Sequence, residues 1–201
     1  MIRVLIAEDQ AMVRGALASL LTLEGDLEVV AQVARGDEVL AATRDSAPDV
    51  ALLDIEMPGG DGLSAAAQIA DALPDVRVVI LTTFGRPGYL RRAMESGARG
   101  FVLKDAPATE LATAIRRVMA GERVLDPALA AAALAEGESP LTPRESEVLG
   151  AARGGAPVAD LAGRLHLSAG TVRNYLSSAM QKLGAHSRAE AVQVAEDKGW
   201  L

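Results

Sequence analysis

Short apolar runs alternate with longer amphipathic stretches over the first 120 residues. The short runs are rich in Val, Leu and Ile and have the length of buried strands. They occupy residues 4–7, 29–33, 50–53, 76–81 and 100–103. Between them apolar residues recur at helical spacing, as at Leu111, Ile115 and Val118. Strands that alternate with helices in this way predict a doubly wound parallel sheet of five strands with five helices.

The last third of the chain has helical signals alone. Thr142-Pro143-Arg144-Glu145 has the pattern of a capping box with proline at the first helical position, and Gly154 ends that helix. Further helices are expected over about 157–165, 168–183 and 187–198. The stretch between the two patterns combines an alanine-rich run with Gly, Pro and acidic residues, which predicts a linker that contains a short helix. The expected organisation is therefore a domain over 1–120, a linker over 121–139 and a small four-helix domain over 140–201.

Charge is distributed unevenly along the chain. The net charge is −7, yet residues 161–189 contain three arginines and one lysine and no acid. The small domain is thus the part suited to meet a polyanion. There is no cysteine, and no apolar stretch has the length of a signal peptide or a membrane span, so we expect a cytoplasmic protein without direct membrane insertion.

Candidate chemistry lies where the predicted strands end. Glu8 and Asp9 follow the first strand, Asp54 follows the third, Thr82 the fourth and Lys104 the fifth. In an open parallel sheet these ends share one crevice. Clustered carboxylates repel one another unless a hard cation joins them, so the pattern suits Mg²⁺ and a phosphorylatable aspartate. Taken singly, each residue is more simply a helix cap or a solvated side chain; together, in one register, they indicate a phosphoryl-transfer site.

This set of residues resembles the receiver domain of two-component response regulators. Beyond the acids it includes Met57-Pro58 and Asp61-Gly62. The resemblance implies strand order 2-1-3-4-5 and phosphorylation of Asp54 by a sensor histidine kinase. It also implies Mg²⁺ held by Glu8, Asp9, Asp54 and the backbone carbonyl of Glu56. Thr82 would bond a phosphoryl oxygen, and Phe101 would be the aromatic that turns inward as Thr82 moves.

Two positions near this site need separate hypotheses. Many receivers have proline after the lysine, but Asp105 follows Lys104 here, and a cis bond without proline costs about 3–4 kcal/mol. The geometry of that bond is left open. Glu56 and Phe84 flank the expected path of attacking water, so we expect them to set the lifetime of the phosphoryl group.

The predicted helix over 168–183 has the features of a recognition helix. It follows a short corner of helix-turn-helix length, and its polar side carries groups that pair with bases or phosphates. The candidate DNA contacts are Thr171, Arg173, Asn174, Ser177, Ser178 and Lys182. His166 and His186 are expected in turns or near phosphates rather than as metal ligands, because nothing pairs them at ligand spacing.

The same region resembles the LuxR-type (NarL/FixJ) DNA-binding domain. The shared motifs are Leu-Thr-Pro-Arg-Glu at 141–145, Glu-Val-Leu at 147–149, Thr-Val-Arg at 171–173 and Lys-Leu-Gly at 182–184. The resemblance implies a transcription regulator that binds double-stranded DNA as a homodimer formed on phosphorylation, with RNA polymerase as a further candidate partner. In the family the receivers often pair through their first and fifth helices, here about 10–23 and 109–120. Likeness at 6–10, 81–84, 86–89 and 171–176 to a regulator of membrane-lipid desaturation implies a membrane-bound kinase.

Two other functions fit parts of the pattern. Asp54 could be the turnover nucleophile of a Mg²⁺-dependent phosphatase with Glu56 as general acid, although a substrate cap domain is missing and the helical domain would have no purpose. Alternatively, the chain could bind DNA constitutively and use its receiver for protein contacts alone. The leading interpretation is a phosphoacceptor, with at most autophosphorylation and autodephosphorylation activity.

Overall fold

The computed structural model describes residues 1–83, 87–135 and 139–201. Contacts divide the chain into two compact units, and each is described by itself. The first consists of Met1–Gly85 and Arg92–Ala130, and the second of Arg86–Arg91 and Ala131–Leu201. Among the helices of the described segments, none combines the length and apolar character that a membrane crossing requires.

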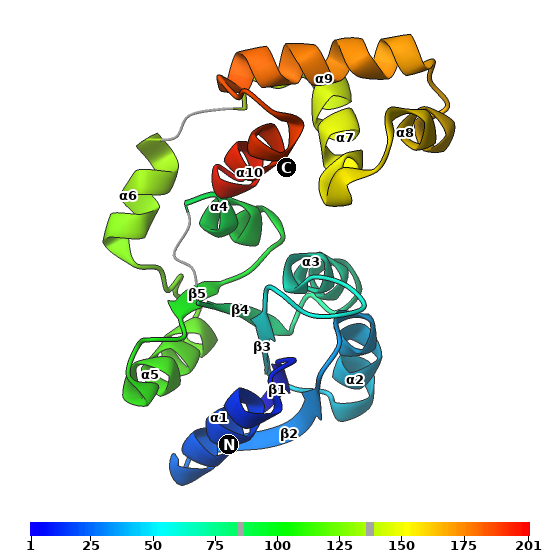
Figure 1. Ribbon diagram of the computed structural model, residues 1–201. Helices are drawn as coiled ribbons and strands as arrows, with labels where there is room; N and C mark the ends of the chain where they lie inside the picture. Colours follow the sequence, from blue (N-terminus) through cyan, green and yellow to red (C-terminus); the bar gives the residue numbers. More distant parts are fainter. Residues whose placement is uncertain (84–86, 136–138) are drawn as a thin grey trace. The chain divides into compact units, whose positions relative to one another are not determined.

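The first unit contains a five-stranded parallel sheet (Figure 1). Its strand order, β2-β1-β3-β4-β5, confirms the predicted topology. The central strand β3 is buried along its whole length, which explains its continuous apolar sequence. The strands are β1 (Ile2–Ala7), β2 (Leu27–Val33), β3 (Val50–Asp54), β4 (Arg77–Thr82) and β5 (Gly100–Leu103).

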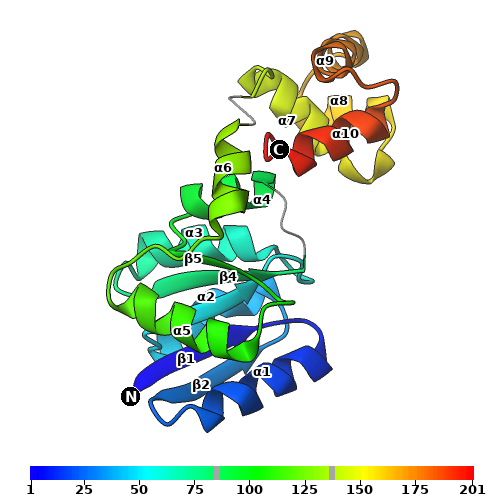
Figure 2. The ribbon, with the colours of Figure 1, turned by 90° about the vertical axis from the view of Figure 1, so that its left-hand side faces the viewer.

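Helices cover both faces of this sheet (Figures 1 and 2). Helices α1 (Ala11–Leu23) and α5 (Ala108–Met119) contact one another on one face, and α2 (Val39–Ser46) and α3 (Gly62–Ala72) contact one another on the other. A short 3₁₀ helix, η1 (Gly36–Glu38), lies between β2 and α2, and helix α4 (Pro87–Glu95) lies between β4 and β5. Leu52, Val79 and Ile115 are fully buried in the core between the sheet and the α1–α5 layer.

Two glycine-dependent contacts fix the loop that follows β3. A side chain at Gly36 would place its Cβ 1.9 Å from the carbonyl oxygen of Gly60, so the loop after β2 can approach the loop after β3 only with glycine there. At Gly62 a Cβ would lie 1.9 Å from the carbonyl oxygen of Asp54. The start of α3 is therefore pressed against the end of β3, where the candidate nucleophile lies.

The chain between the two predicted domains begins as an extension of the sheet. Val124 forms an isolated parallel bridge with Gly100: the Phe101 N–H donates to the Val124 carbonyl at 2.9 Å, and the Val124 N–H donates to the Arg99 carbonyl at 2.9 Å. Helix α6 (Pro127–Ala135) then follows, which confirms the expected short helix. The domain boundaries at 120 and 139 stay predictions.

The second unit contains the four helices expected from the capping signals, which are α7 (Pro143–Ala151), α8 (Val158–Leu165), α9 (Ala169–Leu183) and α10 (Arg188–Asp197). Thr142 and Glu145 form the predicted capping box of α7, and Ser168 caps α9 by accepting from the Thr171 N–H at 3.0 Å. Gly184, with φ 64°, ends α9. Their shared core includes Leu149, Leu161 and Val172. The short η2 (Arg153–Gly155) separates α7 from α8.

Candidate functional site

The predicted strand-end residues converge in the first unit. Asp54 ends β3, Thr82 ends β4, Glu8 and Asp9 follow β1, and Lys104 follows β5. All of them except Glu8 line a cavity of about 100 Å³ beyond the carboxyl edge of the sheet. Its lining consists of Asp9, Gln10, Asp54, Glu56, Thr82, Thr83 and Lys104.

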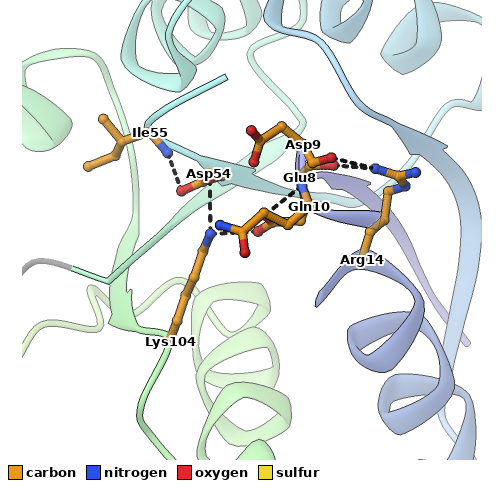
Figure 3. Close-up of polar contacts among 7 residues, drawn as sticks. All are labelled: Glu8, Asp9, Gln10, Arg14, Asp54, Ile55 and Lys104. Carbon is orange, nitrogen blue, oxygen red and sulfur yellow. Dashed lines mark hydrogen bonds and ion pairs between the residues drawn. The ribbon is translucent and has the colours of Figure 1, made fainter. Parts of the chain in front are cut away.

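Lys104 lies between two buried carboxylates (Figure 3). Its Nζ is 2.6 Å from Oε2 of Glu8 and 2.9 Å from Oδ2 of Asp54. Glu8 is 1 % exposed and Asp54 6 %. The other Asp54 oxygen, Oδ1, accepts a hydrogen bond from the Ile55 N–H at 2.8 Å. Both carboxylate oxygens of the candidate nucleophile are therefore held in place, Oδ2 by Lys104 and Oδ1 by the backbone N–H of the next residue.

The charges in this cluster are not balanced. Burial raises the pKa of the Glu8 carboxyl; the close contact with Lys104 acts in the opposite direction, and the nearby Asp54 raises the pKa further. For Lys104 burial alone would lower the pKa, but the pairs with Glu8 and Asp54 outweigh it, and the pKa of the ammonium is raised. One cation thus serves two buried acids, with Asp9 close beside them.

The donor set fits a hard divalent cation. Glu8, Asp9 and Asp54 each offer a carboxylate oxygen, and these oxygens lie within 4.8 Å of one another. Oε2 of Glu8 is buried, and its contact with Lys104 is an ion pair without good hydrogen-bond geometry. Oxygen ligands of this kind are what Mg²⁺ prefers. Glu56 is exposed two residues after Asp54 and lines the same cavity.

Three neighbours of the site were not predicted from the sequence. Gln10 and Thr83 line the cavity, and the Gln10 N–H donates to Oε1 of Glu8 at 3.2 Å. Arg14, one turn into α1, donates to the backbone carbonyls of Glu8 at 2.5 Å and Asp9 at 3.4 Å (Figure 3). The sequence shows only that Arg14 lies in the first turn of a predicted helix, four residues after Gln10. This position does not predict a contact with the loop before the helix.

The remaining receiver predictions have the following positions. Thr82 is buried at 3 % exposure beside the cavity. Phe101 is also buried, at 3 % exposure, and lines a separate cavity together with residues of α5 and of the segment that leads into α6. The Lys104–Asp105 bond is trans, since no cis peptide occurs in the described segments. Phe84, proposed with Glu56 to control water, lies outside the described residues.

The candidate DNA contacts on α9 lie in three different environments. Arg173, Asn174 and Ser177 are exposed along one side of the helix. Thr171 is partly buried and its hydroxyl is 2.8 Å from that of Ser168, within the helix cap. The opposite stripe packs inward as predicted, with Val172, Leu176 and Ala179 buried and Met180 and Leu183 beside them.

Ser178 and Lys182 form a group of their own, because both contact Glu145 on α7. The Ser178 hydroxyl donates to Oε1 of Glu145 at 2.6 Å, and Lys182 Nζ donates to Oε2 at 2.6 Å. Oε2 also accepts the Thr142 N–H at 2.6 Å. Glu145 is 4 % exposed. The sequence predicts Glu145 correctly as part of the capping box. It does not predict that the same carboxylate also binds Ser178 and Lys182 on α9.

The two histidines lie in turns, as expected. His166 has φ 53° and ends α8 in the left-handed conformation. The His186 N–H donates to Glu190 at 2.7 Å just before α10. Within the described residues, the group whose ligand atoms lie close enough to share a metal ion consists of Glu8, Asp9 and Asp54, and it includes neither histidine.

Comparison with known proteins gives matches to two family models. Residues 4–116 match the response regulator receiver domain, and residues 139–195 match the bacterial regulatory proteins of the luxR family. Two proteins of Bacillus subtilis (strain 168) are similar over all of this chain and all of their own length. They are the transcriptional regulatory proteins YvfU, 48 % identical, and DesR, 46 % identical.

A solved structure is similar over almost the whole chain. The response regulator RcsB in complex with DNA has a TM-score of 0.68 and 26 % identity, covering 98 % of each chain. A second structure with the same TM-score and identity contains two RcsB dimers bound to two parallel DNAs.

Proposed function

This chain belongs to the LuxR family of two-component response regulators, and on that basis we propose that phosphorylation of Asp54 controls its binding to DNA. The family consists of DNA-binding transcription regulators, and the chain combines a receiver domain with a LuxR-type DNA-binding domain. The observation that carries the proposal is the position of Lys104 between Glu8 and Asp54 at the buried strand ends. We take 1–120 as the receiver, 121–139 as the linker and 140–201 as the DNA-binding domain.

The proposed input is one phosphoryl transfer. A carboxylate oxygen of Asp54 attacks the phosphorus of a phosphohistidine on the kinase; the P–O bond forms, the P–N bond breaks, and the imidazole leaves with the kinase. Lys104 then faces the new phosphoryl oxygens and neutralises part of their charge, and the Thr82 hydroxyl donates a hydrogen bond to one of them. Glu8, Asp9, Asp54 and the Glu56 carbonyl would hold Mg²⁺, which when bound supplies further positive charge to those oxygens.

The site also sets how the signal ends and spreads. Glu56 lies beside the cavity, where a carboxylate can orient or exclude the water that hydrolyses the phosphoryl group. Thr82 and Phe101 are both buried, on neighbouring strands, and Phe101 pairs in register with Ile80. If Thr82 shifts toward the phosphoryl group, the buried side chains that pack around it must therefore adjust their positions. In this proposal Phe101 is the aromatic side chain that turns inward as Thr82 moves.

We propose α1 and α5 as the surface for dimerisation. Apart from Met1, the exposed large hydrophobic side chains of the described residues are Met12, Leu20 and Leu23 on α1 and Met119 on α5. A groove of about 430 Å³ between these helices has mostly apolar walls, including Val13, Leu17 and Leu111. Apolar surface concentrated in this way is typical of interfaces. The RcsB dimers on DNA support a dimeric output.

The proposed output is promoter recognition by two copies of α9. A single domain offers few phosphate contacts, and two copies on a two-part site add their affinities through a raised effective concentration. The partners are a sensor histidine kinase, double-stranded DNA and a second copy, with RNA polymerase as a further candidate. We propose that the protein acts in the cytoplasm, because it would meet both the kinase phosphodonor and DNA there. The similarity to DesR supports a membrane-bound kinase.

The test is genome-wide mapping of binding sites with Asp54 intact and with Asp54→Asn. We expect occupied sites to require Asp54, and the phosphorylated protein to double in mass with concentration. A protein that stays monomeric with and without a phosphodonor would contradict the dimer. Unchanged occupancy in Asp54→Asn would favour the constitutive adaptor, and steady release of phosphate from small phosphoesters would favour the phosphatase.

A further inference from the structure

The DNA-binding domain contains a buried acid beside its recognition helix. Glu145 is 4 % exposed, and it lies on α7, 33 and 37 residues before the two side chains of α9 that it contacts. Burial of a carboxylate is costly unless it is paired and hydrogen-bonded. Here both oxygens are satisfied, Oε1 by Ser178 and Oε2 by Lys182 and the Thr142 N–H.

The acid is ionised throughout the range in which a regulator works. The hydrogen bond from Lys182, followed by those from Ser178 and Thr142, lowers the pKa of Glu145 to about 2. Glu145 therefore keeps its negative charge, and in the structure its Oε2 lies 2.6 Å from Nζ of Lys182. A duplex that approaches α9 meets this pair as a nearly neutral group.

Ser178 is restricted in the same way. A serine hydroxyl has one hydrogen to donate, and that hydrogen is directed at Glu145. Phosphate oxygens accept hydrogen bonds, so Ser178 has no donor to give them while it contacts Glu145. Arg173, Asn174 and Ser177, in contrast, are exposed on α9.

We propose that Glu145 is a positioning residue for DNA recognition, which cancels the charge of Lys182 and fixes Ser178 so that readout falls to Arg173, Asn174 and Ser177. An uncompensated lysine at this place would add affinity for any duplex, since phosphate contacts carry no sequence information. The acid therefore lowers non-specific binding and leaves the base-reading side chains unaffected. This inference rests on the proposed use of α9 as the recognition helix.

Glu147 provides a matched control on the same helix. It is an exposed acid of α7 paired with Arg144 at 2.5 Å, and its side chain is 45 % exposed. Glu145→Gln and Glu147→Gln change the formal charge equally, so any general effect of net charge is common to both. Only Glu145→Gln releases a cation of α9.

The experiment measures the affinity of the full chain for a fluorescein-labelled duplex of random sequence, about three helical turns long, at several salt concentrations. Each phosphate neutralised contributes about 0.9 to the slope of log K against log salt. We expect Glu145→Gln to bind this duplex more tightly than wild type and to steepen the slope by about 0.9 relative to Glu147→Gln. Equal slopes for the two variants would overturn the proposal.

A second variant keeps the proposal testable even if Glu145→Gln folds poorly. Glu145→Gln/Lys182→Gln removes the whole pair, so the proposal predicts the wild-type slope; a slope shallower by about 0.9 would show that Lys182 acts with its full charge and would overturn it. Circular dichroism and Trp200 fluorescence confirm that each protein is folded. If wild type itself does not bind duplex DNA at low salt, the proposed function fails instead, and the two failures are distinguishable.

Discussion

Glu8 and Glu145 are both buried glutamates with a lysine nitrogen at 2.6 Å, yet the pKa values of their carboxyl groups shift in opposite directions. Glu8 shares Lys104 with Asp54, and burial, the largest influence, raises its pKa. Glu145 has Lys182 as its own partner along with a hydroxyl and a backbone N–H, and its pKa falls to about 2.

The difference separates a reactive site from a structural one. A cluster with more buried negative charge than its single ammonium can compensate gains free energy from any added cation, which is what a metal-dependent phosphoacceptor requires. A fully paired carboxylate gains nothing from a further ligand, and it acts by fixing its partners. Burial of a carboxylate therefore indicates a reactive or a structural role only when the hydrogen-bond donors and cations around it are counted.

The largest expected effect comes from removing the nucleophile. Asp54→Asn should abolish covalent labelling by a small acyl-phosphate donor, because the amide cannot attack phosphorus as the carboxylate does. Intact-mass spectrometry measures the label. Asp105→Asn, an exposed acid next to Lys104, is the control and should be labelled like wild type. Labelling that persists in Asp54→Asn would place the phosphoacceptor elsewhere.

Mg²⁺ should stabilise the first unit through the excess of acids. At a concentration one hundred times its dissociation constant, a ligand that binds only the folded state adds about 2.7 kcal/mol to the free energy of unfolding. We expect Mg²⁺ to raise the melting temperature of wild type and a chelator to reverse this. Glu8→Gln should lose most of the effect, whereas the exposed Glu28→Gln should keep it. A Mg²⁺ response equal in Glu8→Gln and wild type would show that Glu8 is not a ligand.

Much of this difference was invisible in the sequence. The strands and the acids at their ends were predictable, because apolar runs and parallel topology place Glu8, Asp54 and Lys104 at one edge. The capping box that holds Glu145 was predictable too, because it is local. The contacts of Glu145 with Ser178 and Lys182 join helices more than thirty residues apart. Their formation depends on how α7 packs against α9, which no local pattern encodes.

Acid should unfold the second unit through Glu145. Its pKa in the folded state, about 2, lies below the ordinary value of 4.5, so the unfolded state binds the proton more tightly. The stability that the carboxylate contributes is thus fully present above pH 4.5 and is lost as the pH falls toward 2. Urea unfolding of the full chain, followed by Trp200 fluorescence, measures it.

The variant Glu145→Gln sharpens this test. At neutral pH it should be less stable than wild type by about 1–3 kcal/mol, because hydrogen bonds to a charged group are lost. Between pH 4.5 and 2 its stability should fall less steeply than that of wild type, since the titrating group is gone. A variant with the wild-type pH dependence would assign the acid sensitivity to other carboxylates.

The smallest expected effect belongs to Glu147, two residues away on the same helix. Its partner Arg144 is 58 % exposed and lies N-terminal to it at i,i+3 spacing, the less favourable orientation for an acid–base pair along a helix. Water screens the pair, and ordering two long side chains offsets most of the attraction. Glu147→Gln should therefore change the free energy of unfolding by less than about 0.5 kcal/mol, and added salt should remove the difference. The same urea titrations provide the measurement. If Glu147→Gln were as destabilising as Glu145→Gln, then the number of donors around a buried carboxylate would not be what distinguishes the two acids, and the contrast between Glu8 and Glu145 would need another cause.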